Sequence, residues 1–213
     1  MSGLPLEPEH GGDRYPGFDV LGQAPHWDDA TRAVVERRLG MQSAVRFFSD
    51  AEWAAAGALF DQLLYQRSEP RVPIVQLVDA RLAEDQTDGW HYADMEPDGR
   101  AWHSTLAYLD EDSTREYGTV FADRSWSEQS ELLTSIHELG SSDWHGIIAA
   151  RVWSLWTRYA CTAFYSHPWA WQEIGFAGPA YPRGYKNIGV DRLEPFEVRD
   201  ARPSDDPLKG RVS

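Results

Sequence analysis

The residues that could do chemistry in this sequence do not form a known catalytic spacing. The seven histidines include four in the central part of the chain: His91, His103, His137 and His145. As imidazole ligands these four could converge on a metal ion, but none stands at helical ligand spacing from another histidine. The one Glu-x-x-His pair, Glu7 to His10, lies in a proline-rich stretch and not on a predicted helix. We expect no metal site, and a helical metalloenzyme with His, Glu and Asp ligands stays as an alternative.

A second candidate is the segment 140–146, with the sequence GSSDWHG, which brings serine, aspartate and histidine together. A Ser-His-Asp hydrolase takes these residues from distant parts of the chain and aligns them on a scaffold. We interpret the segment as a turn between two helices, with Asp143 as the N-cap of the second helix. The sequence therefore predicts no catalytic residue here.

Cofactor sites are not indicated either. The glycines from Gly175 to Gly189 follow no predicted strand and are interleaved with prolines, unlike a dinucleotide-binding fingerprint. Cys161 is the single cysteine, so an intrachain disulfide and a Cys-x-x-Cys-His haem site are excluded. Because Cys161 lies in an apolar stretch, we expect a buried, inert thiol. We predict no cofactor-binding and no metal-binding residue in this chain.

The elements that must position any site are predicted to be helices. The spacing of Ser49 and Glu52 fits a capping box, and apolar residues at helical spacing follow as far as Leu64. Further helices are expected from Pro73 to about Leu82, from Asp98 to Glu111, from Ser125 or Ser127 to Gly140, and from Asp143 to about Tyr165, with a short one after Asp28. No alternating segment predicts a strand. The predicted fold is all-α, a single irregular helical bundle with extended N-terminal and C-terminal arms.

The predicted division has three parts: residues 1–44 as an N-terminal arm with a short helix, 45–176 as the helical domain, and 177–213 as an extended C-terminal tail. With 213 residues and 42% apolar content, the chain is large enough for one substantial core. Its formal charge of −14 disfavours nucleic acid and anionic membranes as partners.

Targeting signals are not evident. No stretch approaches the ~20 apolar residues of a membrane span, and Met1 to Arg14 hold no apolar run for a signal peptide. The arginine pair Arg37-Arg38 is internal and is followed by a stretch interrupted by polar residues, unlike a usable twin-arginine signal. We expect a cytoplasmic protein.

Aromatic residues are concentrated in the C-terminal third. Six of the ten tryptophans lie between residues 126 and 171. Large aromatic side chains bury roughly 150–250 Å² each and are frequent anchors in protein interfaces. For any single tryptophan the alternative is burial in the core of the bundle. A Pro/Gly-rich arm cannot bury its aromatic residues against itself, so we expect a partner to cover them. The predicted interface residues are Trp153, Trp156, Tyr165, Trp169, Trp171, Phe176, Tyr181, Arg183 and Tyr185.

Two stretches carry a family resemblance. They are FFSDAE at residues 47–52, and FYSHPWAWQEIGFAGP at residues 164–179 with YPRGY at residues 181–185. Over roughly residues 45–190 the chain resembles the gluconate 2-dehydrogenase subunit 3 family, which includes small subunits of FAD-dependent glucose and fructose dehydrogenases.

The resemblance implies a helical accessory subunit that has no redox centre and is not an enzyme by itself. Its partner would be a large FAD-binding catalytic subunit of the glucose-methanol-choline (GMC) type that oxidises a sugar or glycoside. The family's small subunit often helps the large one to mature. We therefore expect the bundle to dock through its last long helix, while the aromatic tail wraps the flavoprotein. A stand-alone, chaperone-like binding module is the remaining alternative.

Overall fold

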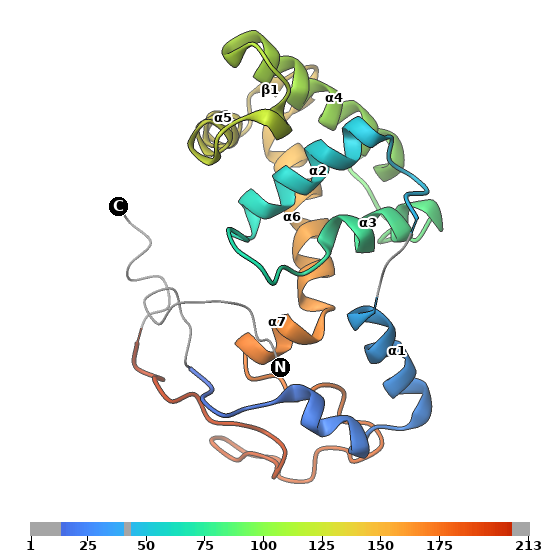
Figure 1. Ribbon diagram of the computed structural model, residues 1–213, viewed down its shortest axis with the longest axis vertical. Coiled ribbons are helices and arrows are strands. Elements are labelled where there is room, and N and C mark those ends of the chain that lie inside the picture. Colours follow the sequence, from blue (N-terminus) through green and yellow to red (C-terminus); the bar gives the residue numbers. More distant parts are fainter. Residues whose placement is uncertain (1–13, 41–43, 206–213) are drawn as a thin grey trace. The chain divides into compact units, whose positions relative to one another are not determined.

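The computed structural model describes residues 14–40 and 44–205, which are mostly helical (Figure 1). The elements in chain order are η2 (Val20–His26), α1 (Asp29–Leu39), α2 (Asp50–Leu63), α3 (Ile74–Ala83), α4 (Asp98–Tyr117), η3 (Phe121–Asp123), α5 (Trp126–Glu138), β1 (Asp143–Trp144), β2 (Ile147–Ile148), α6 (Ala149–Tyr165) and α7 (Pro168–Glu173), where η marks a 3-10 helix. The predicted all-α class is confirmed. No helix in the described ranges has both the length and the apolar content needed to cross a membrane.

The chain divides into two compact units. The first unit takes the described residues within Met1–Met41, together with Ser68–Val72 and the described part of Phe164–Ser213. The second unit consists of the described part of Gln42–Arg67 and of Pro73–Ala163. The predicted division at residues 44 and 176 stays a prediction.

Local signals set the starts of α2 and α5. Ser49 caps α2 through the predicted box, in which its Oγ accepts from the amide of Glu52 and the Glu52 carboxylate accepts from the amide of Ser49. Ser125 and Glu128 form the same box at α5. Each box satisfies amides that a helix end otherwise leaves without partners. Both predicted helix starts are confirmed.

The start of α6 differs from the prediction, because Asp143 is not its N-cap. Residues 143–148 form a hairpin in which Trp144 pairs with Ile147, and both turn residues, His145 and Gly146, have positive φ. That geometry is typical of a tight two-residue hairpin turn. The Asp143 carboxylate accepts from the amide of Gly146 at 3.0 Å and so stabilises this turn. The two strands are the exception to the predicted absence of a sheet.

The first amides of α6 are satisfied by backbone and not by a side chain. The amide of Ala149 donates to the Ser142 carbonyl at 3.0 Å, and the amide of Ala150 donates to the Gly140 carbonyl at 2.8 Å. The turn before the hairpin therefore caps α6, which explains why the helix begins six residues after Asp143.

The core of the second unit is aromatic. Helix α2 contacts α3, α4, α5 and η3, and Phe60 of α2 packs on Trp102 of α4. Trp102 also packs edge-on against Tyr159 of α6, with 5.6 Å between the ring centroids. The Trp156 indole of α6 donates to the Thr105 hydroxyl of α4 at 3.1 Å. Helix α6 is thus held to α4 by ring packing and by the hydrogen bond of the Trp156 indole, whereas the buried Trp102 indole nitrogen has no hydrogen-bond partner among the described residues.

The first unit joins residues from near the two ends of the chain. Trp171 of α7 lies in a buried cluster with Val20, Trp27 and Val35. A Cβ added to Gly178 would lie 2.6 Å from the Trp27 ring, and Gly178 has a φ of +77°. Only glycine fits that close approach without strain. Part of the C-terminal segment is therefore covered by this chain itself.

Polar contacts support this packing. Gln172 accepts from the amide of Val20 at 2.9 Å through Oε1, and its Nε2 donates to the Phe18 carbonyl. Further along, Arg14 donates to Asp200, and the amide of Ala201 donates to the Arg14 carbonyl at 2.7 Å. These contacts fix the course of a segment that has little regular structure.

The expectation of a buried Cys161 is wrong. Its side chain is exposed on α6. Partial burial still raises the pKa of its thiol, which disfavours the reactive thiolate. The apolar neighbours that suggested burial cover other faces of the helix.

Candidate functional site

Two of the predicted interface residues, Trp153 and Trp156, belong to the second unit. Trp156 is fully buried, with 0% of its surface exposed. Trp153 is half-buried and packs on His137 of α5 and on Trp156. Trp156 is therefore a core residue and presents no surface to a partner, whereas Trp153 has an accessible edge.

The other seven predicted residues belong to the first unit, where Trp171 is buried and Trp169 is half-buried. The Trp171 side chain is buried, and its indole donates to the Tyr165 carbonyl at 2.6 Å. Trp169 is half-buried and packs on His167. His167 caps α7, because its Nδ1 accepts from the amide of Trp169 at 3.2 Å.

The remaining five are accessible to different degrees. Tyr165, Phe176, Tyr181 and Tyr185 are exposed. Arg183 is half-buried, donates to the Gln23 amide oxygen at 2.9 Å, and lies over the Phe196 ring at 3.9 Å. These five residues share one unit, and four of them present aromatic surface that a partner could bury.

Sequence reasoning missed two apolar residues in the same unit. Ile188 is 84% exposed and Val190 is 91% exposed. Isolated exposed aliphatic residues are common, but these two stand two positions apart in one short loop. The available signal was the pattern Asn-Ile-Gly-Val-Asp at residues 187–191, in which turn residues surround two aliphatic ones.

This loop is fixed by a buried carboxylate. Glu194 is 5% exposed, and its Oε1 accepts from the backbone amides of Lys186 and Asn187. The Asn187 side-chain amide donates to the Leu193 carbonyl at 3.1 Å. We call residues 186–194 the stapled loop. Its base is closed by hydrogen bonds, so Ile188 and Val190 are presented on an ordered segment.

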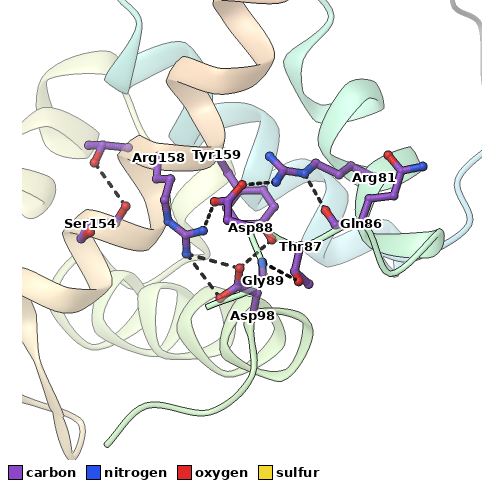
Figure 2. Close-up of polar contacts among 10 residues, drawn as sticks. Arg81, Gln86, Thr87, Asp88, Gly89, Asp98, Ser154, Arg158 and Tyr159 are labelled. Atoms are coloured by element: carbon purple, nitrogen blue, oxygen red, sulfur yellow. Dashed lines mark hydrogen bonds and ion pairs between the residues drawn. The ribbon is translucent and has the colours of Figure 1, made fainter. Parts of the chain in front are cut away.

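The second unit holds a polar cluster that sequence reasoning did not find (Figure 2). Asp88, in the loop between α3 and α4, accepts from Arg81 of α3 and from Arg158 of α6. Arg81 also donates to the Gln86 carbonyl at 2.6 Å through Nε. The loop is therefore bound to two helices by one carboxylate.

Asp98, at the first position of α4, completes the cluster. It is 4% exposed, lies 3.2 Å from Arg158 and accepts from the Tyr159 hydroxyl at 2.7 Å. Burial, and then the hydrogen bond to Asp98, raise the pKa of Tyr159 well above its ordinary value. The arrangement keeps the phenol protonated and the carboxylate paired, which suits a structural role.

The same loop carries an exposed aromatic pair. Trp90 and Tyr92 pack edge-on with 5.5 Å between the ring centroids. Arg158 lies over Trp90 at 4.8 Å, and Arg151 lies over Tyr92 at 4.9 Å and pairs with Asp94. Arg151 and Arg158 are seven residues apart on α6 and so share one face of that helix. Two arginines thus fix the loop that presents two aromatic rings.

Of the four histidines considered as metal ligands, three contact different partners, and His91 is exposed. His103 hydrogen-bonds Glu52 at 2.6 Å, His145 hydrogen-bonds Asp112 at 2.8 Å, and His137 packs on Trp153. Within residues 14–40 and 44–205, no three His, Cys, Asp or Glu side chains are grouped as metal ligands. The pair Glu7 and His10 lies outside the described residues.

The segment 140–146 forms no catalytic triad among the described contacts. Asp112 accepts from the Trp144 indole and from His145, both at 2.8 Å, and pairs with Arg115. In the part of the chain that the structure describes, His145 hydrogen-bonds Asp112 and no serine hydroxyl. Asp112 therefore anchors the hairpin to α4.

Together these features define a class, a helical protein with anchored loops that present aromatic and aliphatic side chains at its surface. A family model described as Gluconate 2-dehydrogenase subunit 3 matches residues 50–178. The chain belongs to this family, whose name describes one subunit of a multi-subunit enzyme. A search of curated proteins found no match, and a search of solved structures found none either.

Proposed function

We propose that this chain is a non-catalytic small subunit that binds and stabilises an FAD-dependent oxidoreductase of the GMC type, acting on a sugar or glycoside. The family supports the role of a subunit. The observation that carries the proposal is a group of exposed apolar side chains in the C-terminal part of the first unit, which includes Tyr165, Phe176, Tyr181, Tyr185, Ile188 and Val190.

These residues favour a protein partner over free exposure. Large apolar side chains on a soluble protein mark interaction surfaces when they share one region. Tyr181, at 66% exposure, and the two aliphatic residues of the stapled loop keep most of their surface free. The stapled loop, which carries Ile188 and Val190, is already ordered by Glu194, so its binding to a partner would cost little conformational entropy.

The proposed role is stabilisation by mass action. A subunit that binds only the folded partner shifts the partner's folding equilibrium, by ~2.7 kcal/mol when it is present at 100 times its Kd. FAD and the sugar hydroxyl would both lie in the partner, which would carry out the hydride transfer. This chain would supply no reacting group.

Co-expression tests the proposal. A tagged GMC-type flavoprotein from the same organism is purified with and without this chain, and soluble yield, FAD content and sugar oxidation are measured. We expect a stoichiometric complex, with FAD content and activity falling at least about tenfold when the chain is omitted. A flavoprotein that is soluble, FAD-loaded and fully active alone would refute the stabilising role.

A pair of double variants locates the surface. Ile188→Ser with Val190→Ser removes apolar area from a loop tip that contributes little to the fold, so we expect loss of the complex with unchanged circular dichroism. The matched control is Val45→Ser with Val120→Ser, which removes exposed aliphatic area from the second unit. Equal effects of the two double variants would contradict the assignment of the surface to the stapled loop. Release of the flavoprotein after folding would favour a chaperone-like module instead.

A further inference from the structure

The first unit contains a cavity of about 580 Å³, to which the stapled loop contributes Lys186, Asn187 and Glu194. It is lined by Gln23, His26, Arg183, Gly184, Lys186, Asn187, Glu194, Pro195 and Phe196. Ligand pockets in proteins are typically about 300–1,000 Å³, so this one has the size for a small organic molecule and exceeds what a bare inorganic anion fills.

The lining is basic, although the chain as a whole is acidic. Arg183 and Lys186 carry positive charge, and His26 adds a third basic group. Among the described residues, neither Arg183 nor Lys186 forms an ion pair with a carboxylate. In a chain with a formal charge of −14, two unpaired cations at one cavity are an unusual local excess.

Glu194 does not cancel this excess at close range. Its Oε1 is bound by two backbone amides of the stapled loop, and the side chain is buried. The carboxylate is therefore directed to the loop backbone, and the lining keeps a net charge of about +1 with His26 neutral.

Arg183 has unused hydrogen-bonding capacity. A guanidinium has five N–H donors, and here Nη1 donates to Gln23. The Nε and Nη2 atoms are buried and have no hydrogen-bond partner within residues 14–40 and 44–205. A buried donor without a partner is costly, so an oxyanion that hydrogen-bonds the Arg183 guanidinium would satisfy donors that the described residues leave unpaired. The guanidinium carbon lies 3.9 Å from the Phe196 ring centroid, so the side chain needs little further ordering.

The other polar groups suit hydroxyl groups. The Gln23 amide nitrogen and the His26 ring add hydrogen-bonding atoms beside the cations, and Asn187 contributes a side-chain carbonyl. We propose that this cavity binds a small hydroxylated oxyanion, whose carboxylate or phosphate lies between Arg183 and Lys186 and whose hydroxyl groups meet the neutral polar residues.

Isothermal titration calorimetry on the purified full-length chain tests this. The probes are gluconate for a carboxylate, glucose 6-phosphate for a phosphate, inorganic phosphate for the bare anion, and glucose as the neutral control. We expect saturable binding of one or both hydroxylated anions, a rise of Tm with that ligand, weakening with salt, and no binding of glucose. Because the flavoprotein is absent, the result does not depend on the proposed function.

Single variants test how much the positive charge of each cavity residue contributes to anion binding. We expect Arg183→Gln to weaken binding at least about tenfold and Lys186→Gln to weaken it several-fold, since each removes one charge-assisted contact. Lys186 is exposed, so its variant keeps the fold even if Arg183→Gln does not. Arg199→Gln, an exposed arginine outside the lining, is the control and should bind normally. Overturning results would be no saturable heat with any anion, or equal binding by all variants. Equal affinity for inorganic phosphate and glucose 6-phosphate would show that the hydroxyl groups of the ligand do not contribute to binding, which would refute that part of the proposal.

Discussion

The sharpest pH-dependent prediction concerns His167, the N-cap of α7. The side chain is 1% exposed and packs beside Trp169. Burial lowers the pKa of His167 to about 4, against a smaller opposing effect of a hydrogen bond with the Arg38 backbone. The folded chain therefore holds this imidazole neutral at pH values where the unfolded chain protonates it.

The sign and size of the change in the free energy of unfolding follow from proton linkage. Between pH 6.5 and 4 the unfolded state binds the additional proton, so the free energy of unfolding falls as the pH falls. With pKa values of about 6.5 unfolded and about 4 folded, the loss attributable to His167 is ~2 kcal/mol at pH 5 and negligible above pH 7.5. For a protein with an unfolding free energy of ~5–15 kcal/mol, this loss is large.

The variant His167→Asn isolates the effect. An asparagine oxygen can accept the Trp169 amide as an N-cap, but it does not titrate. Urea denaturation at pH 7.5 and pH 5 gives, for each protein, the change in the free energy of unfolding between the two pH values. Carboxylate titrations that both proteins share cancel when these two changes are compared. We expect the wild type to lose ~2 kcal/mol more than the variant over this interval. Equal losses would show that His167 is accessible to protons in the folded state, and the burial argument would be wrong.

Two further predictions concern buried carboxylates of the second unit. Asp79 is fully buried and accepts from the amides of Arg46, Phe47 and Phe48, each at 2.9 Å. Asp79→Ala should therefore lower the free energy of unfolding, measured by urea denaturation, by ~3 kcal/mol or more. Asp79→Asn should retain part of the stability. A loss below ~1 kcal/mol would contradict this role. For Asp98, Asp98→Ala should cost ~3 kcal/mol, because it removes one of the two carboxylates that pair with Arg158 and also the acceptor of the buried Tyr159 hydroxyl. Removing only that hydroxyl in Tyr159→Phe should cost ~1 kcal/mol. Similar values for the two variants would show that the charge pair adds nothing.

The starts of α2 and α5 were predictable because their signals are local. The capping boxes at Ser49 and Ser125 involve residues three positions apart, so the sequence alone specifies them. The end of α4 was not predictable in the same way, since the helix continues to Tyr117 and not to Glu111. Its last inward-facing residues, Asp112 and Ser113, are polar, so the apolar periodicity stops before the helix does.

The hairpin before α6 was missed for a different reason. Its turn is His-Gly and not one of the strong hairpin dipeptides, and Asp112 of α4 holds Trp144 and His145 in place. A contact between residues more than thirty positions apart leaves no local pattern. The cysteine prediction failed similarly, because an apolar composition does not tell which face of α6 is covered.

The interface prediction shows where composition stops being informative. Trp156, Trp171, Tyr181 and Tyr185 are all large aromatic residues, yet the two tryptophans are buried and the two tyrosines are exposed. What separates them is the cover that residues far away in the sequence supply, as Val20, Trp27 and Val35 do for Trp171. The density of aromatic residues could indicate a binding surface, but not which residues belong to it.

The buried carboxylates explain how a chain with so much loop can present an ordered surface. Asp79 holds three amides, Asp112 holds the hairpin, and Glu194 closes the stapled loop. A carboxylate has two oxygens that accept several N–H groups, so one buried residue can fix backbone that no helix or sheet satisfies. Exposed Ile188 and Val190 can then remain in water without collapsing onto the chain's own core. If these carboxylates order the loops before any partner arrives, affinity depends on them as much as on the residues that touch the partner.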